Sequence, residues 1–156
     1  MPTTEQENEA ARTHSIRILI IDDDNVNATL AKSVLERNGC IVQIALSPVK
    51  ALERYALEKD SIDLVIVDYF MPSMDGGETV QHLRKLNPDI KVILFSVADE
   101  LHLRQIMKRY PIDAFIHKPL RIQEALQTIH QVVPALATQP VESRAIATTG
   151  VLVRNA

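Results

Sequence analysis

Residues 16–24, IRILIIDDD, place three consecutive carboxylates directly behind an apolar segment of strand length. Adjacent like charges repel by roughly 1 kcal/mol in water and by several times more near a protein surface. Asp22, Asp23 and Asp24 therefore need a partner that offsets the repulsion, and a divalent metal ion is the obvious candidate. The simpler interpretation is a solvated loop that ends in a helix cap, because aspartate is favoured before helices.

Apolar segments like the one before Asp22 recur along the chain and alternate with segments of helical period. This alternation is typical of an α/β fold, in which helices cover both faces of a parallel sheet. The continuous apolar character of the segments indicates strands that are buried on both sides. The five predicted strands are Ile16–Ile21, Ile41–Ala45, Ile62–Asp68, Lys91–Ser96 and Ala114–His117.

Apolar residues at helical spacing between these strands predict the helix faces that pack on the sheet. Ser47-Pro48 predicts a helix N-terminus, because serine caps helices and proline is accepted in the first turn. Pro134 is expected to end the last helix. The predicted core positions are Val26, Leu30, Val34 and Leu35 in the first helix, Val80 and Leu83 in the third, Leu103, Ile106, Met107 and Tyr110 in the fourth, and Ile122, Ala125, Leu126, Ile129 and Val133 in the fifth.

Length and composition predict one domain with flanking segments. The chain has 156 residues, a net charge of -3 and one cysteine, so no internal disulfide can form. Lysine and arginine are scattered, which argues against direct nucleic-acid binding, and no apolar stretch reaches the roughly 20 residues that cross a bilayer. We expect a cytoplasmic protein with a flexible arm at residues 1–14, a domain at 15–134 and a flexible tail or linker at 135–156.

Side chains that can take part in binding or catalysis lie at the predicted carboxyl ends of the strands, where open parallel α/β sheets bind their ligands. Asp22 and Asp23 follow the first strand, Asp68 ends the third, Ser96 ends the fourth and Lys118 follows the fifth. If the first and third strands are neighbours, roughly 4.8 Å apart, the three carboxylates converge. Carboxylate oxygens suit magnesium, and the lysine and serine would add donors for an anionic group, which we expect to be phosphoryl.

At these positions the sequence resembles the receiver domains of two-component response regulators. Four motifs carry the resemblance: LIIDDD for the acidic pair, VDYFMPSMDG around the aspartate of the third strand, VILFS for the hydroxyl and FIHKP for the lysine and proline. Each motif alone is weak, but all four in this order form a specific signature. The resemblance implies a flavodoxin-like (βα)5 fold with strand order 2-1-3-4-5.

The resemblance also implies a role for each residue of the predicted site. Asp68 would accept the phosphoryl group, and Lys118, joined to Pro119 by a cis peptide bond, would contact it together with Ser96. Phe115 would be the switch aromatic, and Asp24 would cap the first helix. The implied magnesium ligands are Asp22, Asp23, Asp68 and the backbone carbonyl of Phe70.

Partners follow from the same resemblance. The phosphodonor would be a phosphohistidine on a sensor kinase or a histidine phosphotransfer protein, and a downstream effector protein would read the altered surface. The chain would act as a phosphoacceptor switch and not as an enzyme on outside substrates. Homodimerisation is left open.

Two apolar residues near the predicted acceptor depart from the pattern of fast-resetting receivers. Phe70 lies two positions after Asp68, and Ala98 lies two positions after Ser96. Neither side chain can orient an attacking water, which predicts a long-lived phosphoryl group. Equally, Phe70 could pack on a neighbouring loop or on a partner.

Two alternatives remain. Haloacid-dehalogenase-type phosphatases also begin with an apolar strand followed by Asp-x-Asp, which Asp22 and Asp24 fit. That family needs a further acidic pair after its lysine, whereas only Glu124 and Glu142 follow Lys118 and no aspartate does. The other alternative is a pseudo-receiver that only binds partners.

Overall fold

A computed structural model describes residues 15–134 of the chain. The predicted arm at residues 1–14 and the predicted tail at 135–156 lie outside the described residues. Within residues 15–134, no helix has both the length and the apolar character needed to cross a membrane. The strands and helices, in chain order, are β1 (Arg17–Ile21), α2 (Asn25–Arg37), β2 (Ile41–Ala45), α3 (Pro48–Glu58), the 3-10 turn η1 (Lys59–Ser61), β3 (Leu64–Asp68), α4 (Gly76–Leu86), β4 (Lys91–Ser96), α5 (Glu100–Arg109), β5 (Ala114–His117) and α6 (Ile122–Val132).

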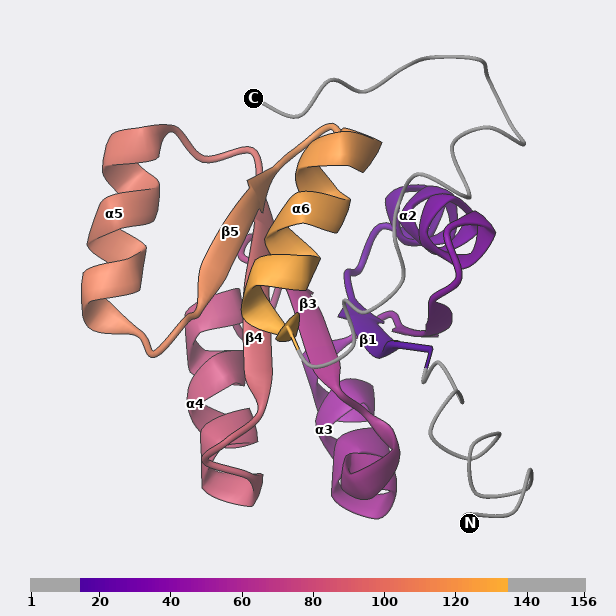
Figure 1. Ribbon diagram of the computed structural model, residues 1–156. Coiled ribbons are helices and arrows are strands. Elements are labelled where there is room, and N and C mark those ends of the chain that lie inside the picture. The colour runs from indigo at the N-terminus through magenta and orange to yellow at the C-terminus, as the bar shows by residue number, and fades with distance from the viewer. Residues whose placement is uncertain (1–14, 135–156) are drawn as a thin grey trace, which may run out of the picture.

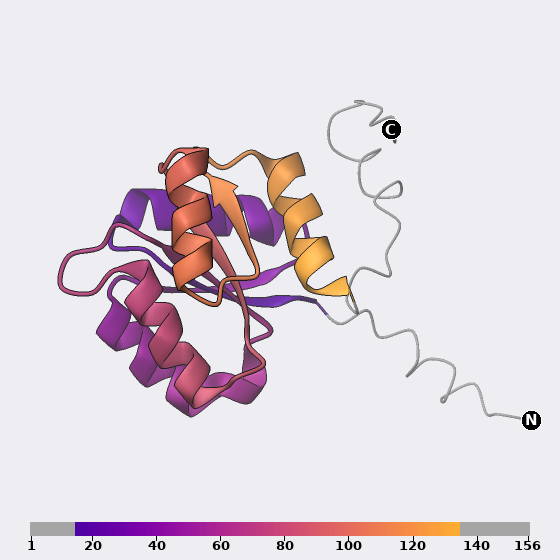
Figure 2. The same ribbon diagram turned by 90° about the vertical axis from the view of Figure 1, so that its left-hand side faces the viewer.

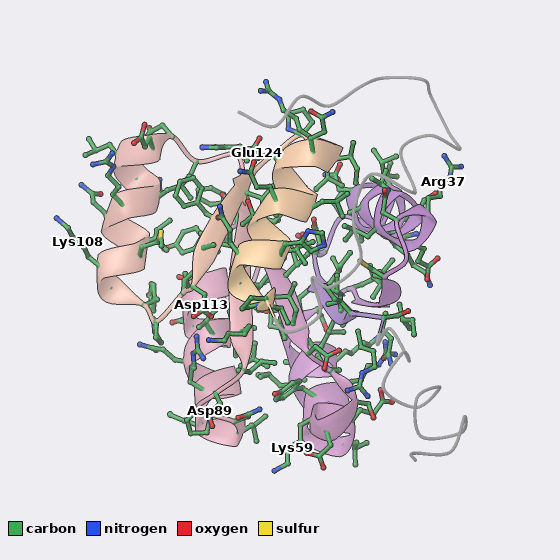
Figure 3. All side chains as sticks on the ribbon, viewed as in Figure 1. Arg37, Lys59, Asp89, Lys108, Asp113 and Glu124 are labelled. Carbon is green, nitrogen blue, oxygen red and sulfur yellow. The ribbon has the colours of Figure 1, made fainter. Side chains whose placement is uncertain are left out.

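The five strands form one parallel sheet in the order β2-β1-β3-β4-β5 (Figure 1). Helices α3, α4 and α5 pack on one face of this sheet, and α2 and α6 pack on the other. Figure 2 shows α3 and α4 on the opposite side of the strands from α2 and α6. Charged side chains such as Arg37, Lys59 and Lys108 extend outward from the helices (Figure 3). The predicted fold class and strand order are confirmed.

Two strands begin later than predicted. β1 starts at Arg17 and β3 at Leu64, whereas the apolar pattern included Ile16 and Ile62. At this end of the sheet the Asp63 carboxylate accepts hydrogen bonds from the Arg17 backbone amide at 2.8 Å and from its guanidinium at 3.1 Å, beside the backbone hydrogen bond from the Asp63 amide to the Arg17 carbonyl at 2.9 Å. Ile16 and Ile62 are nevertheless buried, so their apolar character still reports packing.

The core prediction was wrong for one face of α2. Val26 is 76% exposed and Leu30 is 59% exposed, while the helix buries residues on a different stripe. Alanine lets a helix backbone approach the sheet closely, and this close packing outweighs the burial of the two larger side chains. The buried stripe consists of Ala28, Ala31 and Leu35, so the prediction is confirmed for Leu35, while the predicted Val34 is half-buried.

The predicted core positions of the other helices fit the structure better. Val80 and Leu83 of α4 are fully buried. In α5 and the residue after it, the buried positions are Leu103, Ile106 and Tyr110, while Met107 is half-buried. In α6 and the residue after it, Ala125 and Ile129 are buried, and Ile122, Leu126 and Val133 are half-buried.

Side-chain caps fix where the helices of the site begin. The Asp24 carboxylate accepts hydrogen bonds from the backbone amides of Val26 and Asn27, and the Ser47 hydroxyl accepts one from Lys50. Both caps were predicted from the sequence. The carboxylates of Asp75 and Asp99 cap α4 and α5 in the same way. Because these caps satisfy amides that have no partner within the helix, each loop at this edge of the sheet ends at a defined residue.

Candidate functional site

Three carboxylates meet at the carboxyl ends of β1 and β3. These strands are direct neighbours, with Ile21 paired to Val67, so the residues that follow them lie side by side. Asp22, Asp23 and Asp68 each offer a carboxylate oxygen, and these oxygens all lie within 4.8 Å of one another. Asp22 and Asp68 are buried, whereas Asp23 is exposed. The predicted convergence of the three aspartates is confirmed.

Lys118 brings a positive charge to the same place from the end of β5. Its ammonium lies 2.9 Å from Asp22 Oδ2 and 3.2 Å from Asp68 Oδ2. Its backbone amide donates a hydrogen bond to the Ser96 carbonyl at 2.9 Å, which ties the end of β5 to the end of β4. The predicted cis bond between Lys118 and Pro119 is present. The lysine therefore reaches across the sheet to both buried carboxylates.

The electrostatics of the cluster show a deficit of positive charge. Burial raises the pKa of Asp68, and the neighbouring charge of Asp22 raises it further, although Lys118 acts in the opposite direction. Burial alone would lower the pKa of Lys118, but its hydrogen bond to Asp22 and the charge of Asp68 outweigh burial and raise that pKa. One ammonium thus serves two buried carboxylates, with a third beside them. The cluster favours additional positive charge.

The residues present fit a magnesium ion. Magnesium prefers oxygen ligands, is usually bound through one or two carboxylates and retains several waters. Asp22, Asp23 and Asp68 supply such ligands on one side, and the exposure of Asp23 leaves the other side open to solvent. A divalent ion would also supply the charge that Lys118 alone does not.

Asp24, the third acid of the DDD run, lies outside this cluster. Its backbone amide donates to Asp22 Oδ1 at 2.9 Å, while its carboxylate accepts the first amides of α2. An Asp-x-Asp phosphatase would need Asp22 and Asp24 to act together on a substrate. The capping contacts of Asp24 count against that alternative.

Ser96 and Phe115 lie where the sequence placed them. Ser96 is fully buried at the end of β4, and its hydroxyl oxygen accepts a hydrogen bond from the Ala98 amide at 3.2 Å. The preceding residue of β4 pairs with Asp68 across the sheet, so Ser96 is close to the predicted acceptor. Phe115 is half-buried and packs against the core under α3, α4 and α5, with the edge of its ring toward His117.

The loop after Asp68 is held tightly to the start of α4. The Gly76 amide donates to the Tyr69 carbonyl at 2.8 Å, and the Phe70 amide donates to Asp68 Oδ1 at 3.3 Å. A Cβ atom at Gly76 would lie 2.5 Å from the Asp68 carbonyl oxygen, so only glycine permits this approach. The loop therefore presents the Asp68 side chain in a fixed place.

Sequence reasoning missed the surroundings of Phe70. Its ring packs edge-to-face against the adjacent Tyr69 and against His102 of helix α5, and not against the neighbouring loop or the partner that the sequence analysis considered. Sequence analysis gave His102 no role in the site. No local pattern could have found this contact, because the two residues are far apart in the chain and meet only through the loops that follow β3 and β4.

Comparisons with known proteins identify the family of the chain. Residues 18–130 match the family model of the response regulator receiver domain. The response regulator MprA of Mycobacterium ulcerans (strain Agy99) is 31% identical over 112 residues, which cover 72% of this chain and 47% of that protein. The chain therefore belongs to the response regulator receiver domain family of two-component systems.

Solved structures give the same result. A response regulator receiver domain protein from Clostridium thermocellum has a TM-score of 0.71 at 26% identity, covering 77% of this chain and 95% of that one. A CheY-like receiver domain protein from Methanospirillum hungatei JF-1 has a TM-score of 0.69 at 28% identity, covering 81% and 100%. The chain spans about half the length of the curated relatives it matches.

Proposed function

We propose that Asp68 accepts a phosphoryl group from a phosphohistidine on a sensor kinase or a histidine phosphotransfer protein. The observation that carries this proposal is the position of Lys118, whose ammonium lies between the buried carboxylates of Asp22 and Asp68. Once Asp68 carries a phosphoryl group, a cation in this position can contact the oxygen atoms of that group. Membership of the receiver family supports the same acceptor.

In the transfer, a carboxylate oxygen of Asp68 attacks the phosphorus atom. The new P–O bond forms as the P–N bond to the donor imidazole breaks, and the electron pair of that bond returns to the imidazole nitrogen, which takes up a proton. Such a reaction needs positioning and charge stabilisation more than covalent work by the protein. Lys118 would contact an oxygen of the transferred group, and Ser96 would donate its hydroxyl proton to another.

Magnesium would be held by Asp22, Asp23, Asp68 and the backbone carbonyl of Phe70. When bound, the ion supplies positive charge for the phosphoryl oxygens during transfer. Lys118 favours the ionised form of Asp68, whereas the charge of Asp22 opposes it, so the acceptor would ionise more readily once the repulsion between the carboxylates is offset. Transfer is therefore expected to depend on the divalent ion.

Phosphorylation would act as a two-state switch. The aspartyl phosphate adds about -1.5 to -2 of charge, which would draw the Ser96 hydroxyl toward it and open space for Phe115 to turn inward. The surface formed by α5, β5 and α6 would then change, and a downstream protein would bind one state better than the other. The chain would change only its own phosphorylation state, and it would meet its kinase partner in the cytoplasm.

Hydrolysis of the aspartyl phosphate, which returns the switch to its first state, would be slow. Phe70 and Ala98 carry no polar group that could orient a water molecule for attack on the phosphoryl group. Phe70 is 49% exposed, and its backbone amide donates to Asp68 Oδ1 at 3.3 Å, so its ring is attached next to the acceptor and would exclude water from it. The expected lifetime is longer than that of receivers with polar residues at these two positions.

The proposal is tested by intact-mass spectrometry after incubation with magnesium and acetyl phosphate. The native chain is expected to gain one phosphoryl group, which is lost in Asp68→Asn and in the absence of magnesium. Asp24→Asn is the matched control and should label normally, because asparagine also caps helices. A label that persists in Asp68→Asn and disappears in Asp22→Asn would favour a phosphatase-like site, and no label in any variant would favour a partner-binding pseudo-receiver.

A further inference from the structure

Three aromatic rings connect the acceptor loop to α5. Tyr69 and Phe70 follow Asp68 directly, and His102 lies in the first turns of α5. Each pair of rings is in edge contact: the centroids of Tyr69 and Phe70 are 5.1 Å apart, and His102 lies 5.9 Å from each of the other two. The three rings therefore form a closed triangle, defined here as the aromatic triangle.

The members of the triangle are anchored to different degrees. Tyr69 packs against the core under α5, and the His102 backbone is fixed by its amide hydrogen bond to Asp99 Oδ1 at 2.8 Å. Phe70 belongs to neither core cluster. Its backbone is tied to Asp68 Oδ1, but its ring is oriented by Tyr69 and His102. Loss of either contact should therefore let the Phe70 ring turn.

We propose that His102 is a positioning residue that holds the Phe70 ring beside the acceptor and thereby prolongs the life of the aspartyl phosphate. This inference rests on the proposed function, because it concerns hydrolysis of the group on Asp68. In hydrolysis a water oxygen attacks the phosphorus atom, the bond to the Asp68 oxygen breaks, and inorganic phosphate leaves while the water proton passes to solvent. A fixed Phe70 ring blocks the approach of that water.

The contact also determines which step is sensitive to His102. Phosphoryl transfer to Asp68 depends on the carboxylates and on Lys118, none of which the imidazole contacts in this structure. Hydrolysis depends in addition on whether water reaches the phosphorus atom. His102 substitutions should therefore leave labelling nearly unchanged and accelerate loss of the label.

The test measures decay of the label by intact mass after acetyl phosphate is removed, with magnesium present. Because an edge-to-face ring contact is a modest interaction, His102→Ala is expected to shorten the lifetime by about two- to tenfold. His102→Phe keeps a ring at this position and should restore most of the lifetime. Gln105→Ala is the control, because it alters an exposed residue of the same helix and should have no effect.

A double-mutant cycle separates positioning from a general structural effect. In a Phe70→Ala background the ring is gone, so adding His102→Ala should change the lifetime no further. Equal effects in both backgrounds, or an unchanged lifetime in His102→Ala, would overturn the inference. Failure of the proposed function would look different, because the native chain would then not label at all.

A second readout needs no phosphorylation. In the native protein the ring protons of Phe70 should show resonances shifted by Tyr69 and His102, and His102→Ala should move these resonances toward the values of a freely turning ring. Unshifted resonances in the native protein would count against the triangle in solution. Thermal unfolding of each variant confirms that it is folded.

Discussion

Asp68 is an acid whose ionised form the fold disfavours. Because burial raises its pKa above the ordinary value, the folded state binds a proton more readily than the unfolded state does. Stability from this group therefore rises as the pH falls through its folded pKa, and the ionised group destabilises the fold at higher pH. A neutral residue of the same shape removes that penalty.

In metal-free buffer near neutral pH, Asp68→Asn is expected to raise the free energy of unfolding by about 1 kcal/mol. The gain should shrink as the pH falls through the folded pKa of Asp68, because the native carboxyl is then protonated and resembles the amide. Urea unfolding followed by circular dichroism at two pH values measures both effects. A variant less stable than the native chain at neutral pH would show that the Lys118 contact outweighs burial.

The residues of the site were predictable to the extent that the sheet determines them. Asp22, Asp68 and Lys118 lie at the carboxyl ends of apolar strands. Parallel strands bring these ends to one edge of the sheet, so the three side chains meet there independently of the loop conformations. The Phe70–His102 contact depends instead on how two loops fold over that edge. The sequence gives no indication of how exposed the aromatic ring of a loop residue such as Phe70 will be.

Asp24, at the start of helix α2, shows how adjacent acids take different roles. Asp22 and Asp23 turn toward the cluster, while Asp24 begins α2 as its cap. The strands and most helix faces followed from apolar patterning. The buried face of α2 did not follow from this pattern. Two stripes of the helix could pack on the sheet, one with large apolar side chains and one with alanines, and only the contact with the sheet determines which is buried.

Removal of the Asp24 cap should destabilise the fold without damaging the site. Asp24→Ala leaves the Val26 and Asn27 amides without their carboxylate acceptor and is expected to lower the free energy of unfolding by about 1 kcal/mol. Labelling by acetyl phosphate should stay close to native. Denaturant unfolding and intact mass, measured on the same preparation, test both statements. Loss of labelling in a folded Asp24→Ala protein would give Asp24 a chemical role.

The acidic cluster links ion binding to the folding of the protein. Its residues come from the ends of β1 and β3 and are brought together only when the sheet is formed, so the unfolded chain presents no such site. A ligand that binds only the folded state stabilises it, by about 2.7 kcal/mol when its concentration is one hundred times its Kd. The DDD run, which repels itself in isolation, would then contribute to stability once magnesium is present.

Magnesium at millimolar concentration is therefore expected to raise the melting temperature of the native chain, and the increase should grow with the logarithm of its concentration above Kd. Asp23→Asn should abolish most of this increase, because it removes an exposed ligand whose loss leaves the buried pair of Asp22 and Lys118 in place. Asp24→Asn should keep the full increase, since asparagine retains the cap.

Thermal unfolding followed by circular dichroism, with sodium chloride at matched ionic strength as the control, distinguishes a bound ion from general screening. If sodium chloride stabilises the protein equally, the cluster needs only diffuse counterions, and the magnesium assignment fails.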